Sequence, residues 1–390
     1  MEQRRLRVAF CTDTLPPIAD GVTRTLDELA PTLLASGVEL LFVTAVTPDR
    51  ALPWRNRVRA IANMPFPLYR SYRMALPIAR SLDPVLDRFA PDVVHVVTPS
   101  FLGLYGVRYG RRRGVPVVAS FHTDFVSLFR YYGLRWLEGL GRRLMRRFYN
   151  RCALTLAPSR ATAAMLERHG IENVALWRRG VSQERFAPSF RSDTLRAQLD
   201  GGAPILLYVG RLAKEKRLDY LVAAVRSLER WGLSFKLVLV GEGPMRAQLA
   251  RDLPRAHFAG YVPPDQLGPW YASADLFVFP STNETFGNVV LEAFASGLPV
   301  VAVNGGGVCE LVTAGRDGVL APPEDPVAFA REIRALLAQP ERRSRMGEQA
   351  RATALTYRWP EVNERLLDCY AQVIAAHSRT ASCASAVAPR

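Results

Sequence analysis

Short apolar runs alternate with amphipathic helical segments from one end of the chain to the other. The runs lie at Leu6–Phe10, Val38–Ala45, Val93–Val97, Val115–Phe121 and Ala153–Ala157 in the first half, and at Ile205–Val209, Lys236–Val240, Ala256–Ala259, Leu276–Phe279 and Pro299–Val303 in the second. Few polar residues interrupt them, which is typical of strands buried on both faces, and strands separated by helices form parallel sheets. The sequence therefore predicts an α/β fold with two doubly wound, Rossmann-like domains.

The length of the chain agrees with two domains, because 390 residues exceed what one hydrophobic core usually holds. A polar stretch that contains Pro188 and ends in LDGGAP separates the two series of strands. Such stretches commonly join domains. We expect the first domain at residues 1–187 and the second at 188–356, with an Ala/Ser-rich disordered tail over 378–390.

Composition excludes several classes of protein. With 49% hydrophobic and 22% charged residues, the chain is not dominated by disorder, collagen or coiled coil. No stretch approaches the ~20 uncharged apolar residues of a membrane-spanning helix. The start, MEQRRLRVAF, has no apolar leader, and the five cysteines are scattered without metal-ligand spacing. We therefore expect a cytosolic protein with reduced thiols.

Positive charge is concentrated in the first half of the chain. The net charge is +15, and residues 1–200 carry 30 basic and 17 acidic side chains, whereas residues 201–390 carry 21 and 19. Codon usage explains the preference for arginine over lysine but not this asymmetry. A field of this kind favours a large anionic partner, either nucleic acid or an anionic membrane surface.

A basic segment at Tyr131–Cys152 is the clearest candidate for that contact. Helical phasing places Leu137, Leu140, Leu144 and Phe148 on one stripe, and five arginines flank or oppose it: Arg142, Arg143, Arg146, Arg147 and Arg151. Two interpretations are open, a surface helix packed on its own sheet or a basic helix at an anionic membrane. In the long insert between Pro48 and Pro77, Trp54, Phe66 and Tyr69 are candidate interfacial anchors.

Ligands of open α/β sheets bind at the carboxyl ends of the strands, so the strand-to-helix turns are the places to search. Gly21 ends the first turn, CTDTLPPIADG, just before a predicted helix, where backbone amides can approach a phosphate. In the second domain Arg211 and Lys216 leave the end of the first strand. Two cations there suit a diphosphate leaving group, although an ordinary solvated loop remains an alternative.

The stretch FPSTNETFGNVVLEAFASGLPVVAV carries two glutamates eight residues apart. Glu284 lies on a loop, and Glu292 lies in a helix predicted to begin near Gly287. Carboxylates accept hydrogen bonds from sugar hydroxyls, and the helix start can present amides to phosphate, so the pattern favours a nucleotide-sugar site. The alternative is structural, with Glu284 facing the helix dipole and Glu292 in a salt bridge.

Together these motifs resemble the retaining GT-B nucleotide-sugar glycosyltransferases of family four. The resemblance rests on E-x₇-E in its context, the GRLAKEK turn, the VGEGP loop and Gly260–Val262, and it spans Leu6 to about Ala376. It implies two Rossmann-like domains facing each other across a cleft, with YRWPEVNERLLDCYAQV in a helix over 357–377 that crosses back to the first domain. DTLPPIADGVTRTLDELA, SFHTDF and LWRRGV are most similar to glycolipid-synthesising members, namely sulfoquinovosyl-diacylglycerol synthases and mannosyl- or glucosyl-glycolipid synthases.

The resemblance also implies roles for individual residues. Arg211 and Lys216 hold the diphosphate, Glu284 contacts the transferred sugar, and His122 lies beside that sugar. The implied donor-binding residues are Gly21, Gly210, Val262, Phe286, Gly287, Asn288 and Glu292, with Glu292 on the ribose and Val262 near the base. No D-x-D motif occurs, so we expect no metal and no other cofactor, with the two cations neutralising the diphosphate.

The expected function is transfer of a mannose- or glucose-class hexose, with retained configuration, from a nucleoside-diphosphate sugar to a membrane lipid such as diacylglycerol or a glycolipid. The expected location is the inner face of the cytoplasmic membrane. A soluble or polyprenyl-linked oligosaccharide acceptor, a nucleotide-sugar epimerase of the same fold, and a basic nucleic-acid-binding protein remain alternatives. No RNP-like run supports specific binding of nucleic acid.

Overall fold

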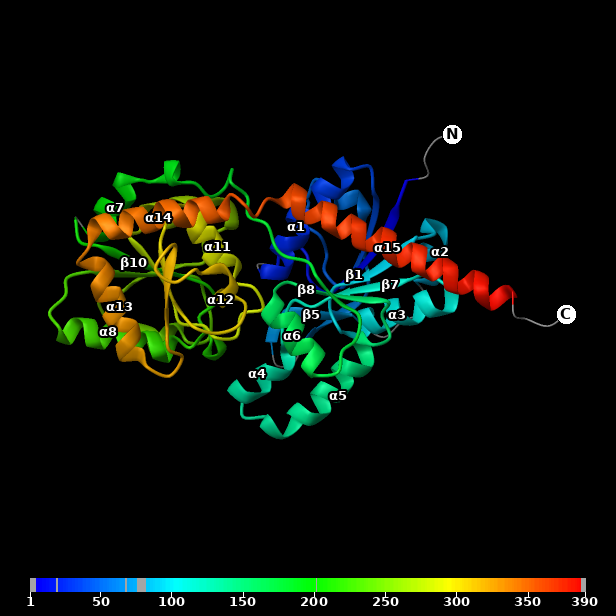
Figure 1. The fold of residues 1–390 in the computed structure, drawn as a ribbon, viewed down its shortest axis with the longest axis horizontal. Coiled ribbons are helices and arrows are strands. Elements are labelled where there is room, and N and C mark those ends of the chain that lie inside the picture. Colours follow the sequence, from blue (N-terminus) through cyan, green and yellow to red (C-terminus); the bar gives the residue numbers. More distant parts are fainter. Residues whose placement is uncertain (1–4, 19, 67–68, 76–81, 201, 387–390) are drawn as a thin grey trace. The chain divides into compact units, whose positions relative to one another are not determined.

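A computed structural model describes residues 5–18, 20–66, 69–75, 82–200 and 202–386. Contacts divide the chain into two compact units. Unit 1 comprises residues 1–126, 136–178 and 359–390, and unit 2 comprises residues 127–135 and 179–358. Each unit is a parallel sheet covered by helices (Figure 1), so the two predicted Rossmann-like domains are confirmed. The division falls after Arg178 rather than after residue 187.

Unit 1 contains a seven-stranded parallel sheet in the order β3-β2-β1-β6-β7-β8-β9. Its strands are β1 (Arg7–Thr12), β2 (Glu39–Thr44), β3 (Val58–Ala60), β6 (Val93–Val96), β7 (Val117–Ser120), β8 (Leu154–Ala157) and β9 (Val174–Leu176). Its helices are α1 (Gly21–Ala35), α2 (Asp83–Phe89), α3 (Phe101–Arg113), α5 (Glu138–Tyr149) and α6 (Arg160–Arg168), with a 3₁₀ turn at Arg55–Arg57. Helix α4 (Phe125–Tyr131) begins in unit 1 and continues in unit 2, and the 3₁₀ turn Arg135–Leu137 leads back into unit 1. Along β1, Val8 and Phe10 belong to one hydrophobic cluster and Ala9 and Cys11 to the other, so both faces of the sheet are buried.

The long insert after β2 turns inward at its start. Trp54 is buried and its ring lies 4.6 Å from that of Phe42, so the expectation of Trp54 as a membrane anchor is wrong. The indole completes the core beside β2 because a large apolar side chain gains more from burial there than from solvent. Downstream, β4 (Asn63–Phe66) pairs with β5 (Tyr69–Ala75) as an antiparallel hairpin. The side chains of Phe66 and Tyr69 lie outside the described residues.

The last helix, α15 (Trp359–Ala386), completes the core of unit 1. It packs beside α1, and Leu366 and Tyr370 are fully buried in the same cluster as Phe10. The Tyr370 hydroxyl lies 2.5 Å from Nδ1 of His95 in β6. The helix continues to Ala386, whereas disorder was expected from residue 378, because an alanine-rich segment favours helix.

Unit 2 contains a six-stranded parallel sheet in the order β12-β11-β10-β13-β14-β15. Its strands are β10 (Ile205–Val209), β11 (Lys236–Val240), β12 (His257–Gly260), β13 (Leu276–Phe279), β14 (Val300–Val303) and β15 (Gly318–Ala321). Its helices are α7 (Asp193–Asp200), α8 (Leu218–Arg230), α9 (Arg246–Asp252), α10 (Gly268–Ser273), α11 (Asn288–Ala295), α12 (Val308–Leu311), α13 (Pro326–Leu337) and α14 (Pro340–Ala354), with 3₁₀ turns at Pro188–Phe190, Lys214–Lys216 and Pro264–Gln266.

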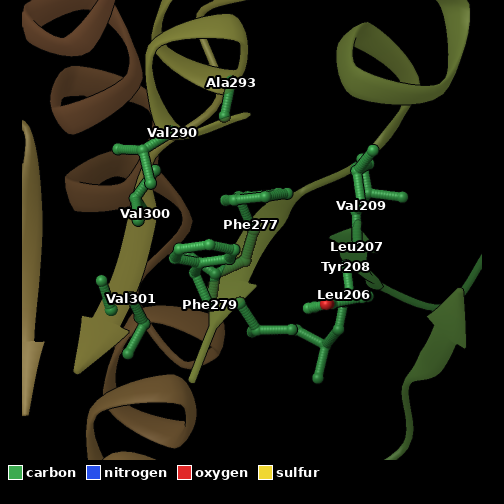
Figure 2. Packing of buried hydrophobic residues seen from close by; sticks show 14 of the residues in the cluster. Leu206, Leu207, Tyr208, Val209, Phe277, Phe279, Val290, Ala293, Val300 and Val301 are labelled. Atoms are coloured by element: carbon green, nitrogen blue, oxygen red, sulfur yellow. The ribbon is translucent and has the colours of Figure 1, made fainter. Parts of the chain in front are cut away.

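Aromatic rings of neighbouring strands fill the core of unit 2. Phe277 and Phe279 of β13 project to the same side of their strand (Figure 2), with ring centroids 5.7 Å apart. Tyr208 of β10 stacks on Phe279 at 6.3 Å and is fully buried. This packing fixes the ends of β10 and β13, and the loops that follow these two strands carry most of the predicted site.

Candidate active site

The loops after β10 and β13 bring a lysine and a glutamate together. Lys216 Nζ donates to Glu284 Oε1 at 2.6 Å, and Ser281 Oγ donates to the same oxygen at 2.7 Å. Both Lys216 and Glu284 are mostly buried. The two residues are 68 positions apart in sequence, and the carboxyl edge of the parallel sheet joins them. Two residues that bind the same ligand must lie close together, and these two do.

Burial alone would raise the pKa of Glu284, but its partners outweigh that effect. The positive charge and hydrogen bond of Lys216, the hydroxyl of Ser281 and the charge of Arg211 together hold the pKa of this carboxyl below its ordinary value. Glu284 is therefore ionised at neutral pH and accepts hydrogen bonds only.

Arg211 meets a carboxylate that the sequence analysis did not select. Its guanidinium donates to Glu215 Oε1, and Tyr132 Oη donates to Glu215 Oε2 at 3.1 Å. Glu215 is buried, and the spacing of four residues between Arg211 and Glu215 was the available signal. The Gly210 N–H already donates to the carbonyl of Val240 at 3.0 Å, so this predicted donor-binding amide is engaged within the sheet edge.

Residues 127–135 contribute a second contact within unit 2. Ser127 Oγ lies 3.0 Å from Asn283 Oδ1, directly before Glu284. With the bond from Tyr132 to Glu215, this short segment contacts both loops of the candidate site. Nothing in the local sequence pattern pointed to it, because the contacts join residues far apart in the chain.

The glycine-rich turn Asn304–Gly307 supports the Glu284 loop. The Gly307 N–H donates to the Glu284 carbonyl at 2.7 Å. Gly306 has φ +59°, and a Cβ there would lie 2.4 Å from the same carbonyl oxygen, so a side chain is excluded. The turn therefore fixes the backbone of Glu284.

Helix α11 begins beside this loop, as predicted. Its N-cap is Gly287, with φ +103° and no capping side chain, so no side chain of its own occupies the amides of the first turn. Asn288 is the first helical residue, and the Phe286 ring is buried against Tyr357. Glu292, one turn further in, is 5% exposed and accepts a hydrogen bond of 2.8 Å from Tyr271 Oη.

Val262 follows β12 and packs partly buried against the core of unit 2. Beside it Tyr261 is exposed. The two residues extend the same carboxyl edge on which Lys216 lies, since β12, β11 and β10 are consecutive parallel strands.

Two predicted residues lie at the carboxyl edge of the sheet in unit 1. Gly21 is the first residue of α1, but Asp20 caps that helix by accepting from the Thr23 N–H at 2.7 Å. His122 follows β7, and its ring meets Trp177 edge-on at 6.4 Å. They therefore belong to a different unit from Lys216 and Glu284.

The predicted stripe of α5 is buried at one end only. Leu140 and Leu144 are exposed, whereas Phe148 and Tyr149 are buried. Burial of these two consecutive aromatics rotates the packed face away from the leucines, because only one face of a helix can meet the sheet.

The five arginines of the segment have different surroundings. Arg142 donates to Glu138 at 2.7 Å, Arg146 lies over Gly170, and Arg151 is partly buried beyond the helix end. Arg143, Arg146 and Arg147 are exposed. Since Arg146 lies against Gly170, Arg143 and Arg147 are the best placed of the predicted membrane contacts.

The comparisons with known proteins decide the family. Residues 19–185 match the family described as "Glycosyltransferase Family 4", and residues 203–339 match "Glycosyl transferases group 1". The chain is 36% identical to a GDP-mannose-dependent alpha-mannosyltransferase of Mycobacterium tuberculosis, over 94% of this chain and 97% of that protein. The chain is a family 4 glycosyltransferase. The predicted resemblance, and with it the expectation of an enzyme, is confirmed.

Two further proteins place this glycosyltransferase among its relatives. It is 30% identical to the GDP-mannose-dependent alpha-(1-6)-phosphatidylinositol dimannoside mannosyltransferase of Mycobacterium tuberculosis, over 90% of this chain and 93% of that one. The fold matches a sucrose-phosphate synthase from Thermosynechococcus elongatus with a TM-score of 0.80 at 23% identity, covering 95% of this chain and all of the other. This second likeness establishes the GT-B fold.

Two features are absent from the described part of the glycosyltransferase. Within the described ranges, no helix is both long and apolar enough to cross a bilayer. Across the same part of the chain, no group of three or more His, Cys, Asp or Glu side chains is arranged to hold a metal ion.

Proposed function

We propose that this glycosyltransferase moves a mannose-class hexose from a nucleoside-diphosphate sugar to a lipid acceptor at an anionic membrane surface, with retained configuration. The observation that carries the proposal is the Lys216–Glu284 pair beside the uncapped start of α11. A cation, a carboxylate and a helix start without a capping side chain together match the diphosphate and hydroxyl groups of a nucleotide sugar. The GDP-mannose named for two relatives favours mannose and a guanine donor.

In this proposal Lys216 and Arg211 neutralise the diphosphate as the glycosidic bond breaks. Both cations face carboxylates, Glu284 and Glu215, which hold them in place at the strand edge. Negative charge that grows on the leaving oxygen is then met by groups that need no reorganisation. The transfer would proceed without a metal or other cofactor.

Glu284 would contact hydroxyls of the transferred sugar, and Glu292 would contact the ribose. The carboxylate of Glu284 is ionised and already oriented by Lys216 and Ser281, so it suits the role of acceptor for sugar hydroxyls rather than that of an acid. No second carboxylate has been identified opposite it, so we favour departure of the diphosphate and entry of the acceptor hydroxyl on the same face of the sugar. Positioning and charge stabilisation would supply the rate.

The remaining predicted residues take supporting roles. Val262 would lie near the base, and the amides at Gly287 and Asn288 would bind phosphate. His122 would contact the sugar from unit 1. Gly21 suits a neutral sugar hydroxyl better than a phosphate, because the Asp20 carboxylate already occupies that helix start.

The proposal of a lipid acceptor is supported by the net positive charge of residues 1–200 and by the exposed arginines of α5. Arg143, Arg146 and Arg147 are exposed on this helix, and each arginine near an anionic surface contributes up to about 1 kcal/mol. One relative is named for a phosphatidylinositol dimannoside acceptor. The protein would accordingly work as a peripheral protein on the inner face of the cytoplasmic membrane, without specific binding of nucleic acid.

A transfer assay tests the proposal. The full chain is incubated with radiolabelled GDP-mannose, UDP-glucose or UDP-galactose, with vesicles containing diacylglycerol or phosphatidylinositol, and with EDTA in a parallel set. We expect label from GDP-mannose in the lipid phase, unaffected by EDTA. Label found only in an isomerised nucleotide sugar would favour an epimerase, and label found only in a soluble oligosaccharide would overturn the lipid acceptor.

A further inference from the structure

Helix α5 and the turn before it expose three large apolar side chains. Trp136, Leu140 and Leu144 are 77%, 52% and 58% exposed. Leu140 and Leu144 are four residues apart in α5, so they follow one another on one face of the helix. Trp136 lies in the 3₁₀ turn directly before it, and we call the three side chains a ridge. All six tryptophans of the chain lie among the described residues, and Trp136 is the one that is mostly exposed.

The charges around this ridge are positive. Arg143 and Arg147 are exposed, and their spacing of three from Leu140 and Leu144 places them on the same face. The acidic residue of α5, Glu138, is buried and paired with Arg142. Large apolar side chains interleaved with arginines are the pattern of a helix that lies in a lipid interface, whereas a solvated face would carry polar residues.

We propose that Trp136, Leu140 and Leu144 form an apolar wedge that enters the interfacial region of an anionic bilayer, while Arg143 and Arg147 contact lipid phosphates. This deepens the lipid half of the proposed function, on which it rests. The occupant is a bilayer because the flanking charges are cationic and complement anionic headgroups. Indole and leucine side chains also suit the boundary between headgroups and acyl chains.

The wedge predicts a salt dependence that arginines alone do not give. Charge attraction is screened over about 8 Å at physiological salt and about 3 Å at 1 M, whereas apolar burial is not screened. Binding through arginines only would disappear at high salt. Binding that includes the wedge would weaken and then level off.

The experiment compares full-length variants by flotation with vesicles of 30% phosphatidylglycerol in phosphatidylcholine, from 0.05 to 1 M salt. We expect the W136A/L140S/L144S variant to lose about tenfold or more in partition and to lose the high-salt plateau. The R143Q/R147Q variant should lose binding at low salt and keep the plateau. L355S, at an exposed leucine of unit 2, is the matched control and should bind like wild type.

Depth is measured with brominated acyl chains, which quench tryptophan that reaches the boundary. We expect quenching in wild type that is absent in W136F. Equal partition of the triple variant and wild type at every salt concentration would show that the three apolar side chains do not contribute to binding. That result would overturn the wedge, although the protein would still bind membranes. Failure of wild type itself to float would overturn the lipid half of the proposed function. A wedge-dependent dimer in sedimentation, without quenching, would assign the ridge to a second copy of the chain and overturn the proposal.

A second inference concerns Glu292 and is carried by a different contact. Tyr271 Oη donates to Glu292 Oε2 at 2.8 Å, and the Tyr271 ring is fully buried against Phe186 and Phe277. Two aromatic neighbours leave the phenol little freedom, so the carboxylate is held at a fixed rotation. We infer that Tyr271 is a positioning residue that aims Glu292 at the ribose. This rests on the ribose role of Glu292 in the proposed function.

The test uses hydroxyl-deleted nucleotides, because a purely structural tyrosine would not change discrimination between them. Calorimetry compares GDP with its 2′-deoxy and 3′-deoxy forms. Wild type should prefer GDP over one deoxy form by about tenfold, the scale of one hydrogen bond to a charged group. In Y271F this ratio should fall toward one. Y220F is the matched control, since that hydroxyl donates to the carbonyls of Pro322 and Asp325.

Three results separate the hypotheses. If E292Q keeps the preference for GDP, the ribose role of Glu292 is wrong. If E292Q loses it and Y271F keeps it, the positioning role of Tyr271 is wrong. If Y271F weakens all three nucleotides equally, the tyrosine acts on stability alone and the inference also fails.

Discussion

Two helix starts in the molecule are built oppositely although each follows a strand of a parallel sheet. In unit 1, α1 is capped by Asp20, whose carboxylate accepts from the Thr23 amide and from the Thr14 hydroxyl. In unit 2, α11 begins at Gly287 without a capping side chain, near the Lys216–Glu284 pair. A helix start attracts negative charge. The start of α1 already has the Asp20 carboxylate, whereas the start of α11 has no acidic cap. In the proposed function, only the start of α11 is therefore available to a phosphate.

The largest expected effect comes from removing a cation of the proposed donor site in unit 2. Arg211→Ala should lower turnover at saturating donor by ~10²–10³, the scale of losing one preorganised electrostatic contact, and Lys216→Ala should act in the same direction. Because Glu215 is buried against Arg211, the R211A/E215Q variant is the control that removes the orphaned carboxylate. Turnover near wild type in both single variants would contradict the assignment.

The two glutamates of unit 2 should separate sugar transfer from nucleotide binding. Glu284→Gln should lower transfer at least tenfold and leave GDP affinity nearly unchanged, because its proposed partner is the sugar. Glu292→Gln should weaken GDP by about tenfold, because its proposed partner is the ribose. Calorimetry with GDP and a transfer assay measure both. Equal losses of affinity in the two variants would end this division of roles.

The comparison of helix starts is tested directly by giving α11 a carboxylate like that of α1. Asn288→Asp places the charge in the first turn and should weaken GDP by about tenfold through repulsion of the phosphates. The midpoint of thermal unfolding should not fall, because acidic residues in a first turn stabilise a helix by about 0.3–1 kcal/mol. Asn288→Ala controls for loss of the asparagine side-chain amide. Unchanged GDP affinity in Asn288→Asp would show that phosphate does not approach α11.

The smallest expected effect lies at the other start. Asp20→Ala removes the cap of α1 and should cost about 1 kcal/mol of unfolding free energy, measured with urea. Asp20→Asn retains a good cap and should cost much less. GDP affinity should stay within about twofold in both variants, since the donor phosphates are assigned to unit 2. A large loss of GDP affinity would instead indicate that a donor phosphate binds at the start of α1, and the proposed difference between the two helix starts would be wrong.

Apolar runs along the chain predicted ten strands of the two parallel sheets, but the short edge strands β3, β9 and β15 and the hairpin of β4 and β5 were not predicted. The loop-to-helix boundary correctly placed Glu284 on a loop and Glu292 in a helix. The long-range contacts that hold Arg211 in place could not be predicted from local sequence patterns. Tyr132 reaches Glu215 across 83 positions, and only the folded chain shows the contact. The side of α5 that packs on the sheet stayed open for a different reason. Leu140 and Leu144 formed as good a periodic pattern as the true packed face, and the burial of Tyr149 decided between the two.

The place of α15 in unit 1 has a consequence for the order of folding on the ribosome. The core that contains Phe10 is completed by Leu366 and Tyr370, which are synthesised after every residue of unit 2 up to Arg358. Domains generally fold as units during synthesis. Unit 2 can thus assemble on the nascent chain while the older half still lacks its last helix. A truncated chain ending near residue 358 would retain unit 2 and expose the apolar face of unit 1 that α15 covers.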